Sequence, residues 1–148
     1  MKSQRGTAMA EFVIGAPILM LLLYAVVELG RALVQFSLLA DAARDADRYL
    51  ASKAITDTSG VVNISGAVSS TAKNLVVYGN PAGTGTPVLP GLNVGQVTVS
   101  SDGSNNVTIS VNYPYQSLFG GTIPNFFNSG SVSTGSMNLH SYTSMRAL

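Results

Sequence analysis

Cysteine is absent from this 148-residue chain, and charged residues are scarce. The absence of cysteine excludes disulfide frameworks, thiolate catalysis and cysteine-ligated zinc or iron–sulfur sites together. Charged residues make up 10% of the chain, and the formal net charge is +1. Because the eight basic residues are scattered along the sequence, no basic patch can neutralise several phosphates at once. Nucleic acid is therefore not expected as a partner.

Groups that carry catalysis are also rare in the C-terminal part of the chain. Residues 58–148 contain one carboxylate side chain, Asp102, and one histidine, His140, besides one lysine and one arginine. An enzyme needs acid, base or nucleophilic groups that converge on one site. Asp102 lies in a turn-rich sequence and His140 in an expected strand, so both are assigned structural roles. We expect no enzymatic activity, no cofactor and no bound metal.

Against this background, one long apolar run dominates the N-terminal part. Residues 8–27 are apolar except for Glu11 and a few small or kinking residues. About 20 such residues are needed for a helix to cross the hydrocarbon core of a bilayer. The Ala-x-Ala sequence at residues 8–10 precedes the run, whereas an ordinary signal-peptidase site follows it. The sequence therefore predicts a retained, single-pass transmembrane helix.

The orientation of this helix follows from charge and composition. Lys2 and Arg5 favour a cytoplasmic N-terminus, while three arginines beyond the span oppose that bias. Gly, Ser, Thr and Asn are abundant after residue 56, which is typical of exported β-rich domains with many turns. We expect the N-terminus in the cytoplasm and the bulk of the chain outside the inner membrane.

A short basic leader, residues 1–6, ends in a glycine at a defined distance from the charge in the span. Glu11 is the fifth residue after Gly6, and the aromatic Phe12 and the apolar run follow it. This arrangement resembles the prepilin processing site of type IV pilin-like proteins. The resemblance implies that a prepilin peptidase cuts between Gly6 and Thr7 and leaves the helix as an anchor and assembly stem. Taken alone, Glu11 could equally snorkel to the headgroups from the end of the span.

The stem is expected to be a helix over residues 7–55, with a kink at Pro17. Proline lacks an N–H and leaves the carbonyl of Val13 without its helical partner. Beyond the membrane, apolar residues recur in steps of four and three, with Asp47 occupying one place in the series. This predicted apolar stripe consists of Leu29, Leu33, Phe36, Ala40, Ala43, Leu50 and Ala54.

Opposite charges on the outer half of the stem are three residues apart, as in ion pairs on one helix. The pairs are Glu28 with Arg31, Asp41 with Arg44, and Asp45 with Arg48. They are interpreted either as exposed pairs that contribute little to stability or as charge matching between neighbouring subunits.

Residues 56–148 are expected to form a small α+β domain. Ser65 is placed to cap a second helix that ends before Gly79, and residues 79–91 predict a loop. Alternation predicts strands over residues 93–100 and 106–113, joined as a hairpin. A long loop and a last strand within residues 132–145 complete an antiparallel sheet that covers part of the stem. The large apolar residues of that loop are Leu118, Phe119, Phe126 and Phe127.

Five short features of the N-terminal third carry a more specific resemblance. They are Arg5-Gly6, Glu11-Phe12, Pro17, Glu28-Leu29-Gly30-Arg31 and Ala42-Ala43-Arg44. Together they resemble the TadE-like minor pseudopilins of the tight adherence (Tad, or Flp) pilus, although Asp47 stands where that family more often has a small residue. The resemblance implies a pilin-like fold, residence in the bacterial inner membrane, and a part in initiating or assembling a thin adhesive pilus that supports biofilms.

The same resemblance implies the partners of this chain. These are other pilin-like subunits, the prepilin peptidase and the inner-membrane assembly platform, in addition to the lipid bilayer. It also implies that Glu11 pairs with the terminal amine of a neighbouring subunit, in the membrane or in an extracellular pilus. The alternative is an uncleaved, single-pass adhesin or ligand-binding protein, which N-terminal processing distinguishes from a pseudopilin.

Overall fold

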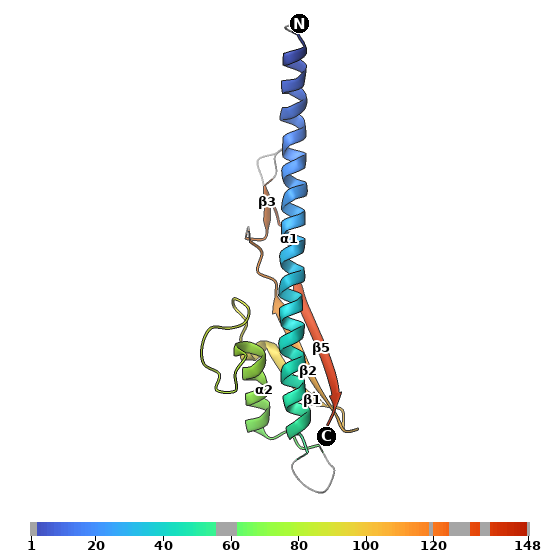
Figure 1. Ribbon diagram of the computed structural model, residues 1–148, viewed down its shortest axis with the longest axis vertical. Helices are drawn as coiled ribbons and strands as arrows, with labels where there is room; N and C mark the ends of the chain where they lie inside the picture. Colours follow the sequence, from blue (N-terminus) through green and yellow to red (C-terminus); the bar gives the residue numbers. More distant parts are fainter. Residues whose placement is uncertain (1–2, 56–61, 119, 125–130, 134–136, 148) are drawn as a thin grey trace. The chain divides into compact units, whose positions relative to one another are not determined.

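The computed structural model describes residues 3–55, 62–118, 120–124, 131–133 and 137–147. It has the expected α+β architecture, a long N-terminal helix with a small three-stranded antiparallel sheet (Figure 1). The chain divides into two compact units. Unit 1 combines Met1–Leu33 with Ser117–Gly135, and unit 2 combines Val34–Gln116 with Ser136–Leu148.

Helix α1 (Ser3–Lys53) forms the stem and begins earlier than residue 7. It includes the last residues of the predicted leader and ends close to the predicted boundary at residue 55. The helix continues through Pro17 without a break, so this proline does not end the stem. A bend at Pro17 stays a prediction.

The sheet of unit 2 has the strand order β1-β2-β5 and is antiparallel throughout. Strand β1 (Val97–Ser101), central strand β2 (Asn106–Pro114) and strand β5 (Asn138–Arg146) are in a register that places Ile109 between Val99 and Thr143. The hairpin predicted from alternation is confirmed. Alternate residues of β2 are fully buried, as predicted: Val107, Ile109, Val111 and Tyr113.

Two predicted strand boundaries are wrong. The first strand does not start at residue 93, because Val94–Gln96 forms a 3₁₀ turn, η1. Its capping box explains this: the Asn93 side chain accepts from Gly95 N–H, and the Gln96 side chain accepts from Asn93 N–H. The segment expected as one last strand is divided, since Ser131–Ser133 (β4) pairs with Thr122–Pro124 (β3) and β5 begins only at Asn138.

The core of unit 2 lies between α1, the sheet and helix α2. From α1 it takes Leu39, Ala43, Ala46, Leu50 and Ala51, which are at most 3% exposed. Ala54, just after the end of the helix, is also fully buried. The predicted stripe is correct from Ala43 onward but wrong before it, because Leu29, Leu33 and Phe36 are 64%, 61% and 44% exposed. In that part the helix is apolar on several faces, so periodicity alone does not identify the buried one.

Helix α2 (Gly66–Tyr78) has the predicted ends. The Ser65 hydroxyl accepts a hydrogen bond from Val68 N–H at 3.3 Å, and Gly79 adopts φ 68° while its N–H donates to the carbonyl of Leu75. A left-handed residue at this point favours glycine. The following residues, 80–93, contain no helix or strand, which confirms the predicted loop, and the Tyr113 hydroxyl donates to the carbonyl of Pro90 in it at 2.8 Å.

The turn between β1 and β2 is organised by Asp102, as predicted. Its carboxylate accepts from Ser104 N–H at 2.8 Å, from Asn106 N–H at 3.2 Å and from the Asn106 side-chain amide at 2.8 Å. Hydrogen bonds to the charged form favour it, so they lower the pKa of Asp102 below its ordinary value.

Unit 1 contains the short β3–β4 hairpin together with residues 3–33 of α1. Figure 1 draws β3 beside the N-terminal half of the helix. Of the apolar loop residues predicted from sequence, Leu118 is 52% exposed. Phe119, Phe126 and Phe127 lie outside the described residues.

Candidate functional site

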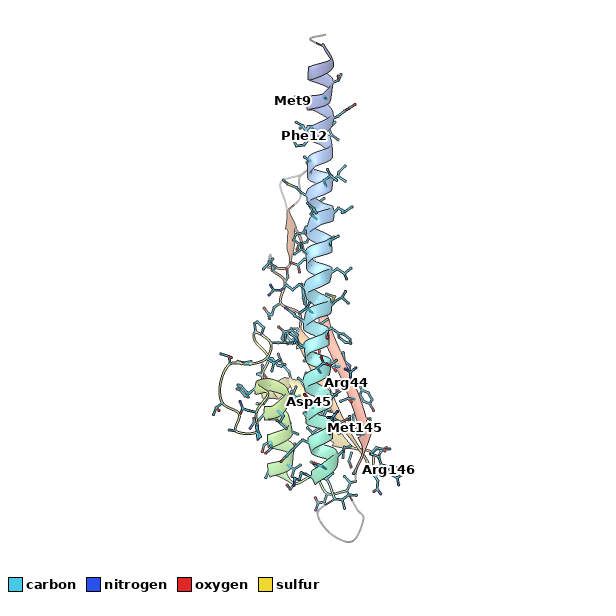
Figure 2. The ribbon with its side chains drawn as sticks, in the orientation of Figure 1. Met9, Phe12, Arg44, Asp45, Met145 and Arg146 are labelled. Carbon is cyan, nitrogen blue, oxygen red and sulfur yellow. The ribbon has the colours of Figure 1, made fainter. Side chains whose placement is uncertain are left out.

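The N-terminal half of α1 presents a continuous apolar surface. Most of its large side chains are at least half exposed, from Met9 at 70% through Phe12 at 68% to Val27 at 50%. Leu21 and Tyr24 are half-buried. In Figure 2, Met9 and Phe12 mark this part of the helix, and the side chains along it project outward. By length and composition the helix can cross a membrane, and none of its most apolar window is buried. An apolar surface of this extent requires lipid or a protein partner.

The predicted processing residues lie at the start of this surface. Gly6, Thr7 and Glu11 are all exposed and all helical. A side chain added at Gly6 would meet no atom within 4 Å, so the fold does not require glycine there. Thr7 and Glu11 are one turn apart on the same face, roughly 6 Å along the axis. The structure thus brings the predicted cleavage point and the predicted assembly carboxylate together.

Of the predicted ion pairs, the one between Asp41 and Arg44 is present. Arg44 Nη1 lies 2.9 Å from Asp41 Oδ1, and the two side chains are 62% and 64% exposed. Exposed pairs of this kind contribute at most about 1 kcal/mol to stability. Within the described residues no ion pair forms between Asp45 and Arg48.

Glu28 has a different role from the predicted pairing with Arg31. Its carboxylate oxygen Oε1 accepts hydrogen bonds from the Ser117 hydroxyl at 3.1 Å and from Leu118 N–H at 3.0 Å. Arg31 Nε is buried and has no hydrogen-bond partner among the described residues. Glu28 therefore ties the loop after β2 to the stem within unit 1. Sequence reasoning missed this contact because Ser117 is 89 residues away, with no local pattern linking the two.

Asp47 is a second carboxylate whose position the sequence marked only as an interruption of the apolar stripe. It is fully buried on α1 within unit 2. Its Oδ2 accepts from the Thr143 hydroxyl of β5 at 3.2 Å, whereas Oδ1 is buried without a partner among the described residues. Burial raises the pKa of Asp47, and the hydrogen bond from Thr143 opposes that shift. A carboxylate in phase with buried positions was the signal that could have identified it.

The remaining candidate for chemistry, His140, is exposed on β5. Its Nε2 lies 3.2 Å from the Ser110 hydroxyl of the neighbouring strand. Within the described ranges, no three His, Cys, Asp or Glu residues are grouped so that they could hold a metal ion.

The exposed apolar helix fits a membrane-anchored protein. Residues 6–48 match the TadE-like protein family, which confirms the resemblance over the N-terminal third of the chain. The match begins at Gly6 and ends at Arg48, so it includes Glu11, Pro17 and Glu28. This family suggests an association with the Tad pilus. No curated protein and no solved structure matches the chain.

Proposed function

We propose that this chain is a minor pilin-like subunit that acts in the assembly or initiation of a Tad pilus, and that it is not an enzyme. One observation carries the proposal: the family match covers the part of α1 whose apolar surface is left uncovered. Such a surface suits a stem that is held by lipid before assembly and by other stems afterwards. The small α+β domain of residues 56–148, which contributes to a buried core, would be carried by this stem.

In this proposal, processing by a prepilin peptidase after Gly6 prepares the stem. The bond between Gly6 and Thr7 lies near the start of α1, so the peptidase must unwind the first turns to reach it. Helix ends open at low cost, and glycine lowers helix stability by about 1 kcal/mol relative to alanine. Gly6 therefore suits a cleavage point both because it is exposed and because it weakens the local helix.

Replacing Gly6 by leucine is expected to block this processing without affecting the fold, since the added side chain meets no neighbour. Intact-mass measurement of the protein from its own host should show loss of residues 1–6 for the wild type and their retention in Gly6→Leu. Gly30→Leu is the matched control, because Gly30 lies on the same helix with equally open surroundings. Wild-type protein that keeps residues 1–6 beside an active peptidase would favour the uncleaved adhesin or ligand-binding protein.

The proposal also includes an orientation, with the N-terminus in the cytoplasm and the C-terminal domain in the periplasm. Lys2 and Arg5 before the span support it. Alkaline phosphatase fused after Leu148 is expected to be active, and a fluorescent protein that folds only in the cytoplasm is expected to be dark at the same position. The reverse pair of results would reject the orientation and the envelope role with it.

A further inference from the structure

Glu28 fixes a loop at the end of the apolar span. It is the first charged residue after Glu11, and residues 12–27 between them carry no charge. Its carboxylate holds Ser117 and Leu118 at hydrogen-bonding distance. The Ser117 hydroxyl in turn accepts from Gly121 N–H at 3.1 Å, which closes the turn that leads into β3. Ser117 and Leu118 therefore lie at the same level along α1 as Glu28.

The chemistry of this loop suits the boundary of a bilayer. Between Asp102 and Arg146 the sequence contains no Asp, Glu, Lys or Arg. Leu118 is 52% exposed although it directly follows a hydrogen-bonded anchor point. An uncharged segment with an exposed apolar side chain loses little by leaving water and gains by placing that side chain among acyl chains.

Two physical limits set the depth of the loop. A carboxylate in the hydrocarbon centre costs several kcal/mol, so Glu28 belongs at the headgroup level. Strands β3 and β4 pair with each other and form a sheet of two strands, so each has an edge outside the ladder. Open sheet edges do not occur in the hydrocarbon region, so the loop that leads into β3 also belongs near the interface and not at the bilayer centre.

We propose that Leu118 forms a second membrane contact, which lies at the boundary between headgroups and acyl chains in the leaflet nearest Glu28. Glu28 is its positioning residue. The contact rests on the proposed anchoring of α1 in a bilayer. It would hold unit 1 at a defined depth, since the span alone is free to slide and tilt.

The chain contains no tryptophan, so single tryptophans can report depth without background. Leu118→Trp is compared with Ile18→Trp in the middle of the span and Tyr142→Trp on β5, whose native side chains are 55% and 67% exposed. Each full-length variant is reconstituted into vesicles of phosphatidylcholine and phosphatidylglycerol. The lipids are brominated either near the headgroup or near the bilayer centre.

Leu118→Trp is expected to show blue-shifted emission and stronger quenching by the shallow label than by the deep one. Ile18→Trp should be quenched most by the deep label, and Tyr142→Trp should remain accessible to an aqueous quencher. Adding Glu28→Ala to Leu118→Trp should reduce the shallow quenching, because the anchor of the loop is lost. Glu28→Gln should largely preserve it, since the amide oxygen still accepts from Ser117 and Leu118.

The controls separate failure of the contact from failure of the anchoring. A water-like signal from Leu118→Trp beside normal quenching of Ile18→Trp overturns the second contact and leaves the anchor intact. Deep quenching of Leu118→Trp equal to that of Ile18→Trp overturns the boundary position. Absence of quenching at Ile18→Trp rejects the membrane span itself and therefore both proposals.

Discussion

Glu11→Ala is expected to abolish or strongly reduce pilus production while synthesis and membrane insertion remain normal. After cleavage, Glu11 would lie one turn from the new amino terminus at Thr7, and the family resemblance implies that it pairs with the terminal amine of a neighbouring subunit. Removing one partner of a charge pair from a low-dielectric environment costs about 3–5 kcal/mol. At 1.4 kcal/mol per factor of ten, this is roughly two to four orders of magnitude in subunit association.

The measurement compares sheared pili, processed protein and membrane protein levels between wild-type and variant cells. Glu11→Gln has nearly the same size but no charge, so it should fail like Glu11→Ala. Glu11→Asp keeps the charge on a shorter side chain and should retain part of the function. Loss of charge lowers the cost of insertion, so reduced membrane levels would point to a different cause. Normal piliation in Glu11→Ala cells would assign Glu11 to snorkelling at the headgroups.

Asp47→Asn is expected to raise the free energy of unfolding of unit 2 at neutral pH by about 1–3 kcal/mol, because a carboxylate costs more to bury than a neutral amide. The wild-type carboxylate is fully buried with Oδ1 unpartnered, whereas the amide is uncharged and its oxygen can still accept from Thr143. Urea unfolding of the full chain in detergent micelles, followed by circular dichroism, measures the change. Asp41→Asn, at an exposed carboxylate, should stay within about 0.5 kcal/mol of the wild type.

The stability of the wild type and that of Asp47→Asn should depend differently on pH. Burial raises the pKa of Asp47 above its ordinary value of 3.8. Protonated Asp47 therefore contributes favourably to stability. This contribution is complete below pH 3.8 and is lost as the pH rises through the pKa of Asp47 in the folded state. Asp102 acts in the opposite direction because its pKa is lowered, but it is common to both proteins. The advantage of Asp47→Asn should therefore shrink on acidification; an advantage that does not change with pH would contradict an ionised, buried Asp47.

The local parts of the fold followed from local chemistry. Ser65 and Gly79 marked the ends of α2 because capping depends on a few neighbouring residues. The alternation in β2 identified its buried face, since one side of that strand meets the core. The buried face of α1 before Ala43 could not be predicted in this way. Leu29, Leu33 and Phe36 are exposed, although they are as apolar as the residues that are buried. Their exposure depends on where the rest of the chain packs, which periodicity does not contain.

In the candidate site, too, the features set by neighbouring residues could be predicted and the contacts between distant residues could not. The spacing of Gly6 and Glu11 is a property of a few residues, and the family match covers both. The contacts of Glu28 and Asp47 join residues 89 and 96 positions apart, so no window of sequence could reveal them. In both cases a carboxylate on α1 meets a hydroxyl supplied by the C-terminal part of the chain.

Because β5 is the last strand in the sequence, the sheet of unit 2 can be completed only late in synthesis. Strand β5 pairs with the central strand β2 over nine residues and carries Thr143, the partner of Asp47 on α1. The two residues are 96 positions apart. At about 5–20 residues per second, synthesis leaves roughly 5–20 s between them. During that interval the stem has been made, but the sheet that covers its outer half is incomplete because β5 is missing. Early insertion of residues 8–27 into lipid would keep most of the exposed apolar surface out of water while the chain waits for β5.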